Sequence, residues 1–246
     1  MERIALVSDI HGNLLALEAV VEDIKRRNVS RVINLGDHVS GPLWPKETLK
    51  YLKSTDWIHI CGNHDRQLTS DDPDTHGLSD AYAFAQIDRE GLRWLESLPA
   101  FKRLEADILA FHGSPQNDLE YMLESVSDGR THLSKKGEIE ARLKGTKARL
   151  AVCGHTHIPR CVRLNNEMTI VNPGSVGIQG FTDNGDHPHV VEIGSPHARY
   201  AVVELDGSAL EVELIAVSYD WDKAADKSME TNRADWTSLL RNGFIE

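Results

Sequence analysis

Histidines and aspartates gather in five short clusters along this 246-residue chain. Each cluster directly follows a run of apolar residues with the length and composition of a buried strand. The clusters are Asp9-Ile10-His11, Gly36-Asp37-His38, Gly62-Asn63-His64-Asp65, Phe111-His112-Gly113 and Gly154-His155-Thr156-His157. Because open α/β sheets bind their ligands at the carboxyl ends of their strands, we expect these side chains to converge on one site.

Imidazole, carboxylate and amide groups together form a ligand set for transition metals. Such a set suits Mn, Fe, Zn, Ni or Co better than Ca, which prefers oxygen ligands alone. Asp9 and His11 in one turn can bind the same cation, and Asp37 after the next strand can bridge to a second one. In an extended loop His155 and His157 would point in opposite directions, so they could serve two different metals. Turn chemistry alone favours Asp and Asn but not repeated His.

Other metal and nucleophile signatures are missing from the sequence. It contains no His-Glu-x-x-His, no Pro-Cys-x-x-Cys and no Gly-x-Ser-x-Gly motif. Its three cysteines lack CxxC spacing, which argues against a disulfide framework and against a cysteine-rich zinc site. Cys61 and Cys153 end two apolar runs, so we expect them to be small side chains buried beneath the site.

The apolar runs that precede the clusters predict the strands that position them. These runs are residues 4–7, 32–35, 57–61, 108–111 and 150–153. Helical periodicity predicts helices over 14–27 and over 45–54, the second with proline in its first turn. A polar loop at 70–77 leads into two further predicted helices, 78–87 and 88–98. Because these two helices follow the third cluster, we expect them to form part of the wall over the site.

The second half of the chain changes character after a predicted helix at 134–144. Asn165-Asn166 and Asp206-Gly207 each separate two strand-like segments, which predicts two antiparallel hairpins. The paired segments are 160–164 with 168–172, and 200–205 with 210–217. The polar stretch 222–241 is predicted to be helical and to lie across the outside. Without a Pro- or Ser-rich linker, residues 1–246 are expected to form a single α/β domain.

The formal net charge of -11 argues against binding to bare nucleic acid through a basic surface. It does not exclude an anionic substrate, because bound divalent cations reverse the sign of a local site. The apolar stretches are strand-sized, well short of the roughly 20 residues of a membrane helix. Met1 leads almost directly into the first strand, which leaves no room for a signal peptide. We therefore expect a soluble, cytoplasmic protein that does not contact membranes.

In order and spacing, the five clusters resemble the motifs of the calcineurin-like metallophosphoesterases, most closely their small prokaryotic stand-alone phosphodiesterase branch. The segments Asn172-Pro173-Gly174-Ser175-Val176-Gly177 and Arg199-Tyr200-Ala201-Val202 are also similar to that branch. The resemblance covers nearly the whole chain. It implies a four-layer αββα sandwich, in which two mixed β-sheets lie face to face and helices flank them.

The resemblance also implies a role for each residue of the clusters. Asp9, His11 and His157 would hold one divalent metal, and Asn63, His112 and His155 a second. Asp37 would bridge the two ions, with Mn the favoured metal. A hydroxide shared by the ions would attack phosphorus in line. His64 would be the general acid at the leaving group, oriented by the carboxylate of Asp65.

Two further histidines, His38 in the second cluster and His59 before the third, are not expected to bind metal. His38 stands directly beside Asp37, at a position where the family varies. It is expected to support the ligands from behind or to pack, although a substrate contact stays open. His59 lies inside an apolar strand, which favours a hydrogen-bonded core histidine over a ligand.

Three alternatives differ from a phosphoesterase of small phosphorylated substrates. A phosphoprotein phosphatase of the same superfamily should show Gly-Asp-x-x-Asp-Arg-Gly. Here Gly36-Asp37 continues as His38-Val39-Ser40-Gly41, without the arginine that clamps phosphate. A binding scaffold such as the retromer subunit should have lost several ligands, and all of them are present. A nuclease would call for extra basic surface. A homo-oligomer remains compatible with the sequence.

Overall fold

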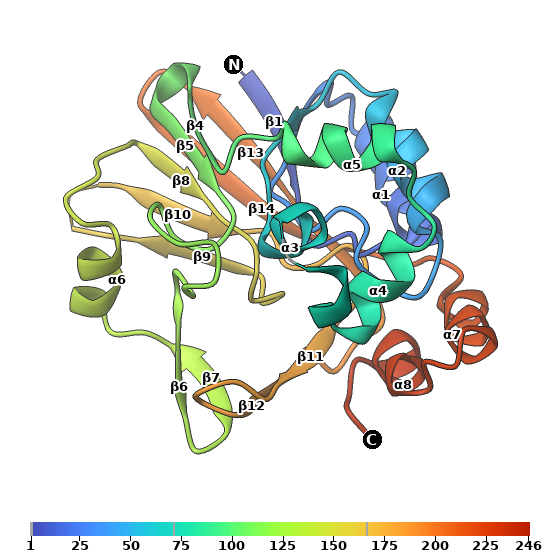
Figure 1. Ribbon diagram of the computed structural model, residues 1–246. Coiled ribbons are helices and arrows are strands. Elements are labelled where there is room, and N and C mark those ends of the chain that lie inside the picture. The colour runs from blue at the N-terminus through green and yellow to red at the C-terminus, as the bar shows by residue number, and fades with distance from the viewer. Residues whose placement is uncertain (1, 71, 166) are drawn as a thin grey trace.

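Two five-stranded sheets form the centre of the molecule (Figure 1). The computed structural model describes residues 2–70, 72–165 and 167–246. The first sheet contains β1 (Glu2–Val7), β2 (Arg31–Asn34), β3 (Ile58–His59), β13 (Ala198–Asp206) and β14 (Ala209–Val217). Its strand order is β14-β13-β1-β2-β3, with β1 antiparallel to β13 and parallel to β2. The strand that carries the first cluster therefore lies in the middle of its sheet.

The second sheet contains β4 (Phe101–Leu104), β5 (Ile108–Phe111), β8 (Leu150–Val152), β9 (Arg160–Arg163) and β10 (Thr169–Asn172). Its order is β4-β5-β8-β10-β9, with parallel pairs at its centre and antiparallel pairs at both edges. The strand pairing of both predicted hairpins is confirmed, since β9 pairs antiparallel with β10 and β13 with β14. Asn166, in the predicted turn of the first hairpin, lies outside the described residues.

Alternate residues of the central strands pack between the two sheets. Ile4 and Leu6 of β1 meet Ile108 and Ala110 of β5 in one fully buried cluster. The intervening residues of β1 face the other way, toward helix α1 (Leu14–Arg26). Because both faces of these strands are covered, their sequences read as continuous apolar runs rather than alternating ones.

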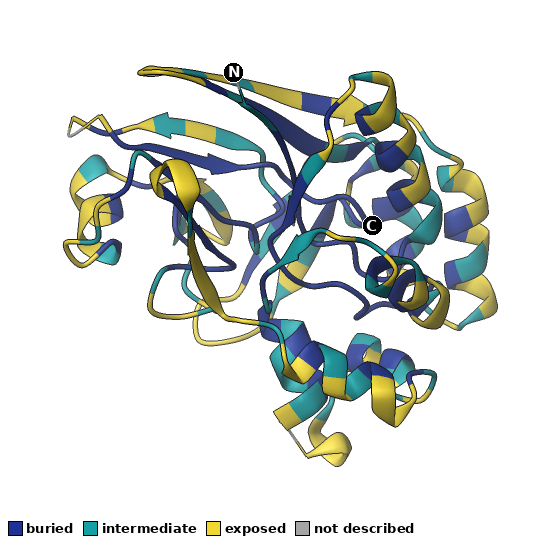
Figure 2. Cartoon of the chain, turned by 90° about the horizontal axis from the view of Figure 1, so that it is seen from above, coloured by how far each residue is buried: buried dark blue, intermediate teal, exposed yellow. Residues whose placement is uncertain are grey.

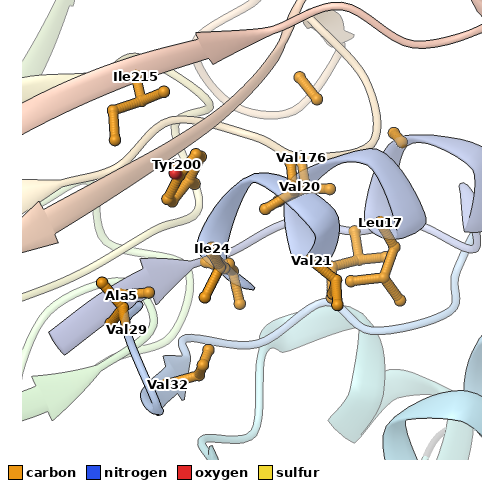
Figure 3. Close-up of a cluster of buried hydrophobic side chains, with 14 of the residues drawn as sticks. Ala5, Leu17, Val20, Val21, Ile24, Val29, Val32, Val176, Tyr200 and Ile215 are labelled. Carbon is orange, nitrogen blue, oxygen red and sulfur yellow. The ribbon is translucent and has the colours of Figure 1, made fainter. Parts of the chain in front are cut away.

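Helices cover the outer face of each sheet. On the first sheet, Val20 and Ile24 of α1 pack against Tyr200 of β13, as Figure 3 shows. α2 (Pro45–Lys53) lies beside α1. On the second sheet, α6 (Lys136–Arg142) buries Ile139 against the outer face. The predicted four-layer sandwich is confirmed, with its exposed residues on the outer sides of the helices (Figure 2).

A third, smaller sheet was not predicted. It consists of β6 (Glu124–Ser127), β7 (Arg130–Leu133), β11 (Gly180–Asp183) and β12 (His189–Glu192), in the order β11-β12-β7-β6. Two short hairpins form this sheet, and they meet through a single parallel pairing of Val190 with Arg130. Short polar strands of this kind carry little apolar periodicity. Hence the sequence around them did not indicate a sheet.

The remaining helices differ from the predictions mainly in their boundaries. α4 (Leu78–Phe84) and α5 (Arg89–Glu96) are shorter than predicted, and α3 (Asn63–Ser70) begins inside the third cluster. The stretch predicted as one helix at 222–241 forms two, α7 (Trp221–Glu230) and α8 (Asp235–Asn242). In the described ranges, no helix combines the length and the apolar character needed to cross a bilayer.

Asp23 ties α1 to strand β13. Its carboxylate accepts hydrogen bonds from the Tyr200 hydroxyl (2.6 Å), from Arg27 Nε (2.7 Å) and from Arg26 Nη2 (2.9 Å). Burial raises the pKa of Asp23, but these three bonds outweigh it and lower the pKa from 3.8 to about 2. The carboxylate therefore stabilises the fold at every pH at which it is charged in the folded state.

We expect Asp23→Asn to lower the free energy of unfolding by about 1–2 kcal/mol at pH 7. Since the folded pKa is depressed, the wild-type advantage is fully present above pH 3.8 and is lost as the pH falls through about 2. Urea unfolding of both proteins at pH 7, 4 and 2.5 measures this gap. Glu22→Gln, on the exposed face of the same helix, serves as the control. A gap that stays constant with pH would contradict the assignment.

Candidate metal centre

The predicted ligands follow the carboxyl ends of five strands, all in loops except Asn63, which is the first residue of α3. Asp9 and His11 follow β1, Asp37 follows β2, Asn63 follows β3, His112 follows β5, and His155 and His157 follow β8. Several of these residues have left-handed backbone conformations. The φ angles are 55° at Asp9, 49° at His11, 56° at Asp37, 70° at His155 and 60° at His157. Such angles cost about 1 kcal/mol each and gather at functional sites, where surrounding contacts hold them in place.

The first ligand group consists of Asp9, His11 and His157, whose ligand atoms lie within 4.8 Å of one another. The Nε2 atoms of His11 and His157 are 3.2 Å apart, and His157 Nε2 lies 3.5 Å from Asp9 Oδ1. All three side chains are buried. Residues 146 positions apart in the sequence thus meet at one point.

The second group consists of Asp37, His112 and His155. His112 Nε2 lies 3.3 Å from Asp37 Oδ2 and 3.0 Å from the amide oxygen of Asn63. The same Asp37 Oδ2 lies 3.8 Å from His11 Nε2 in the first group. One carboxylate oxygen therefore faces both groups, which is the position that a bridging ligand would occupy.

Backbone carbonyls fix which nitrogen of each imidazole faces the site. Three rings donate Nδ1–H to a carbonyl oxygen, namely His11 to Ser40 (2.7 Å), His112 to Leu35 (2.7 Å) and His157 to Ile178 (3.0 Å). Their Nε2 atoms then present lone pairs to the other ligands. His155 is reversed, because its Nε2 lies 3.2 Å from the carbonyl oxygen of Leu119 and leaves Nδ1 for the site.

This arrangement brings lone pairs against each other. The facing Nε2 atoms of His11 and His157 repel unless a proton or a cation lies between them. In the second group, His112 Nε2 likewise faces the oxygens of Asn63 and Asp37. A mixed imidazole, carboxylate and amide set of this kind matches the ligand preferences of transition metals. The residues present therefore fit two divalent ions.

The pKa values of the histidines show which charge the site favours. Burial lowers the pKa of His11 and of His155 to about 4, so both rings are neutral, the form that binds metal. Burial also lowers the pKa of His112, but the carboxylates of Asp37 and Asp9 outweigh it and raise the pKa to about 10. The surroundings of the Asp37 and Asp9 carboxylates thus favour positive charge.

Two glycines allow the backbone to approach the carboxylates closely. A Cβ atom at Gly62 would lie 2.2 Å from Asp37 Oδ1, and one at Gly154 would lie 2.9 Å from Asp9 Oδ2. Neither position has room for a side chain. Close packing against the two carboxylates therefore explains why the third and fifth clusters each begin with glycine.

His64 lies at the accessible side of the site, with its side chain 32% exposed. Its Nδ1 is 2.9 Å from Oδ1 and 3.2 Å from Oδ2 of Asp80, a buried residue of α4. The prediction that Asp65 orients His64 is therefore wrong. Successive helical residues point in different directions, and both His64 and Asp65 belong to α3.

Asp65 instead holds the loop that carries Asp37. Its carboxylate accepts backbone N–H bonds from Asp37 (2.9 Å), His38 (3.0 Å) and Gly62 (2.9 Å). His38 Nδ1 lies 2.7 Å from the same carboxylate, and its Nε2 lies 3.1 Å from His59 Nδ1. The structure thus places His38 behind Asp37, where it supports the loop, and His59 in a hydrogen-bonded position away from the ligands.

Asp80 is the site residue that the motifs did not reveal. The sequence contained one indication that Asp80 is buried, because it lies on the same inward face of α4 as Ala83. A carboxylate on the core-facing side of a helix is rarely buried unless it is paired. The predicted placement of this helix in the wall of the site is confirmed by its contact with His64.

Comparisons with known proteins agree with this fold. Residues 2–195 match the family model of the calcineurin-like phosphoesterase superfamily domain. The chain belongs to this superfamily and is a phosphoesterase by class.

Similar proteins span the whole chain. An uncharacterised protein from Methanocaldococcus jannaschii is 27% identical over 257 residues, covering 95% of this chain and 94% of its own. A metallophosphoesterase from Sphaerobacter thermophilus has a similar structure, with a TM-score of 0.78, 26% identity and 99% coverage of both chains. A hypothetical protein from Pyrococcus horikoshii has the same fold, with a TM-score of 0.76, 21% identity and complete coverage of both chains (100%).

Proposed function

We propose that this protein hydrolyses phosphodiesters or small phosphomonoesters with two divalent metal ions, Mn being the favoured metal. The observation that carries the proposal is the position of Asp37, whose Oδ2 faces both ligand groups. Its other oxygen accepts the backbone N–H of His64 at 3.0 Å. The same carboxylate thereby links the proposed ligands to the proposed acid.

Asp9, His11 and His157 would hold one ion, and Asn63, His112 and His155 the other. When both ions are bound, they supply an activated water at neutral pH and offset the charge of the phosphate. The protein contributes fixed geometry, because backbone carbonyls orient the imidazoles and the left-handed turns aim the side chains. Preorganised ligands need little rearrangement when the phosphate charge develops.

His64 provides the proton for the leaving oxygen in this proposal. Burial lowers its pKa, but Asp37 and Asp80 outweigh burial and raise it to about 9. The ring is therefore protonated at neutral pH, as a general acid must be. Bound cations would offset the charge of Asp37. Asp80 would then be the carboxylate that keeps His64 charged and holds its Nε2 toward the substrate.

The structure argues against the phosphoprotein phosphatase alternative at one position. Gly41 stands where that class places its phosphate-clamping arginine. A Cβ atom at Gly41 would lie 2.3 Å from the His11 carbonyl oxygen and 2.8 Å from Cη2 of Trp236. No arginine fits there without moving the loop, so a small phosphoester is favoured over a phosphoprotein.

A direct assay tests the proposal. Metal-stripped protein is reloaded with Mn, Fe, Zn, Ni or Co and given bis(p-nitrophenyl) phosphate, p-nitrophenyl phosphate and a phosphoserine peptide. We expect turnover of the aryl esters only with metal, fastest with Mn, and slower turnover of the peptide. No hydrolysis of either aryl ester by protein that holds two ions would refute the proposal. Faster turnover of the peptide would favour the phosphatase. Nucleotides, cyclic nucleotides and dinucleoside polyphosphates then narrow the substrate.

A further inference from the structure

The C-terminal helical pair α7–α8 packs against loops that carry or hold the site. It follows the stretch matched by the family model, which ends at residue 195. In Figure 1 the pair lies beside α4, on the side of the molecule that also carries α1. One buried cluster joins it to the loops after β2 and β10 through Leu43 and Ile178.

Trp236 of α8 packs against the loop after β2, which contains the hydrogen-bond acceptor of His11. Its ring is 7% exposed and lies edge-on to the His11 ring, with centroids 6.2 Å apart. Gly41 fits between the two, since a Cβ there would meet both the His11 carbonyl and the Trp236 ring. The residue before Gly41 is Ser40, whose carbonyl oxygen accepts Nδ1–H of His11 at 2.7 Å. Trp236 thus abuts the backbone that sets the orientation of this ligand.

Leu239, one helical turn further, supports the other histidine of the first group. A Cβ at Gly180 would lie 2.9 Å from Cδ2 of Leu239, so the helix packs directly on the first residue of β11. Ile178, two residues earlier and in the same buried cluster as Leu239, accepts Nδ1–H of His157 at 3.0 Å. Both imidazoles of the first group are therefore oriented by carbonyls of loops that rest on α8.

Arg233, between the two helices, reaches a different part of the site. Its Nη1 donates to the hydroxyl of Ser79 at 2.9 Å, next to Asp80 on α4. Asp235 pairs with the remaining nitrogens of the guanidinium at 2.7 and 2.8 Å. Arg233 thus connects the helical pair to α4, the helix whose Asp80 contacts His64.

We propose that α7–α8 is a positioning element of the metal centre, with Trp236 as its key residue. Trp236 and Leu239 hold the Ser40 and Ile178 carbonyls in place, so that the Nε2 atoms of His11 and His157 converge on one ion. The two histidines of the second group, His112 and His155, are oriented by the carbonyls of Leu35 and Leu119, which lie outside the apolar cluster that joins α8 to the loops. The pair therefore acts on the first group selectively.

The test measures metal binding by full-length Trp236→Ala, stripped of metal and titrated with Mn²⁺ by calorimetry. Losing an outer support of a ligand typically weakens metal binding about 10–100-fold. We expect a weakening of this size in one of the two binding events and little change in the other. His11→Ala identifies which event belongs to the first group. Equal weakening of both events, or of neither, would overturn the proposal.

Two further variants separate positioning from loss of stability. Ile139→Ala opens a cavity under α6, on the far side of the second sheet, and should destabilise the fold without changing either metal affinity. Trp236→Phe keeps a buried aromatic ring but shortens its reach to Gly41. It should show the same selective weakening to a smaller extent, and it carries the test if the alanine variant does not fold.

Ser79→Ala gives the contrasting result, in an arm that rests on the proposed function. It removes the hydroxyl that accepts from Arg233 and keeps the Arg233 guanidinium over the Trp236 ring, 5.6 Å from its centroid. It should leave both metal affinities unchanged but lower kcat about 10-fold for esters with poor leaving groups, since α4 carries Asp80. Arg241→Ala, which breaks ion pairs to Asp222 and Asp226 within the same helical pair, should leave both readouts unchanged. A wild-type protein without phosphoesterase activity would refute the proposed function, while the metal titration would still decide the role of Trp236.

Discussion

Asp37→Ala is expected to abolish metal-dependent turnover. Its Oδ2 lies 3.8 Å from His11 Nε2 and 3.3 Å from His112 Nε2, so one oxygen serves both ligand groups. Removing the Asp37 carboxylate takes away the one negative charge that faces both ligand groups. We therefore expect the variant to retain at most one ion and to show only background hydrolysis of bis(p-nitrophenyl) phosphate. Elemental analysis after metal loading and steady-state kinetics measure the two effects.

The control for this variant is Asp74→Ala, because Asp74 is an exposed aspartate that belongs to neither ligand group. It removes the same charge from the chain and should leave both metal content and turnover unchanged. An Asp37→Ala protein that holds two ions and turns over at the wild-type rate would contradict the bridging role.

His64→Ala is expected to lower kcat by about 10²-fold or more on esters with poor leaving groups. An alkoxide leaves slowly unless it is protonated, whereas p-nitrophenolate is stable without a proton. The loss should therefore be large for alkyl esters and much smaller for nitrophenyl esters. The dependence of kcat on leaving-group pKa, compared between wild type and variant, measures this difference. Full kcat on an alkyl ester would exclude His64 as the acid.

Asp80 and Asp65 can be distinguished by the same kinetics. Asp80→Asn should lower kcat roughly 10-fold with the leaving-group pattern of His64→Ala, and should cause no further loss in that background. Asp65→Asn should instead weaken metal binding, because Asp65 accepts three backbone N–H bonds from the loop segments around Asp37. The opposite result would restore Asp65 as the partner of His64.

The sequence predicted which side chains gather at this site because their signal is local. Each of Asp9, Asp37 and His112 follows the carboxyl end of an apolar strand, where α/β sheets bind their ligands. Asp9 and Asp37 follow strands of the first sheet, and His112 follows a strand of the second. Repeated histidine in such turns has no other common explanation. The strands followed from the length of the apolar runs and from hairpin signals such as Asp206-Gly207, which β13 and β14 flank. Their division into two sheets was implied only by the resemblance to the metallophosphoesterases.

The sequence did not predict contacts that depend on how whole elements pack. Asp65 is adjacent to His64 in the chain, but successive residues of a helix do not face each other. Asp80 reaches His64 only because α4 folds back over α3. The polar composition of α8 suggested an outer position, although Trp236 and Leu239 turn inward against the loops of the site. Such orientations follow from tertiary packing rather than from local patterns.

The central position of β1 has a consequence for how the protein is made. This strand pairs with β13, and the two meet at residues about 200 positions apart, as the contact of Arg3 with Glu204 shows. Contacts of such long sequence separation form slowly, since a long loop must close first. A ribosome must therefore synthesise most of the polypeptide before the strand that leads into Asp9 and His11 is paired on both sides. The nascent N-terminal half, with Asp9 and His11 already translated, should not retain metal until the late hairpin docks.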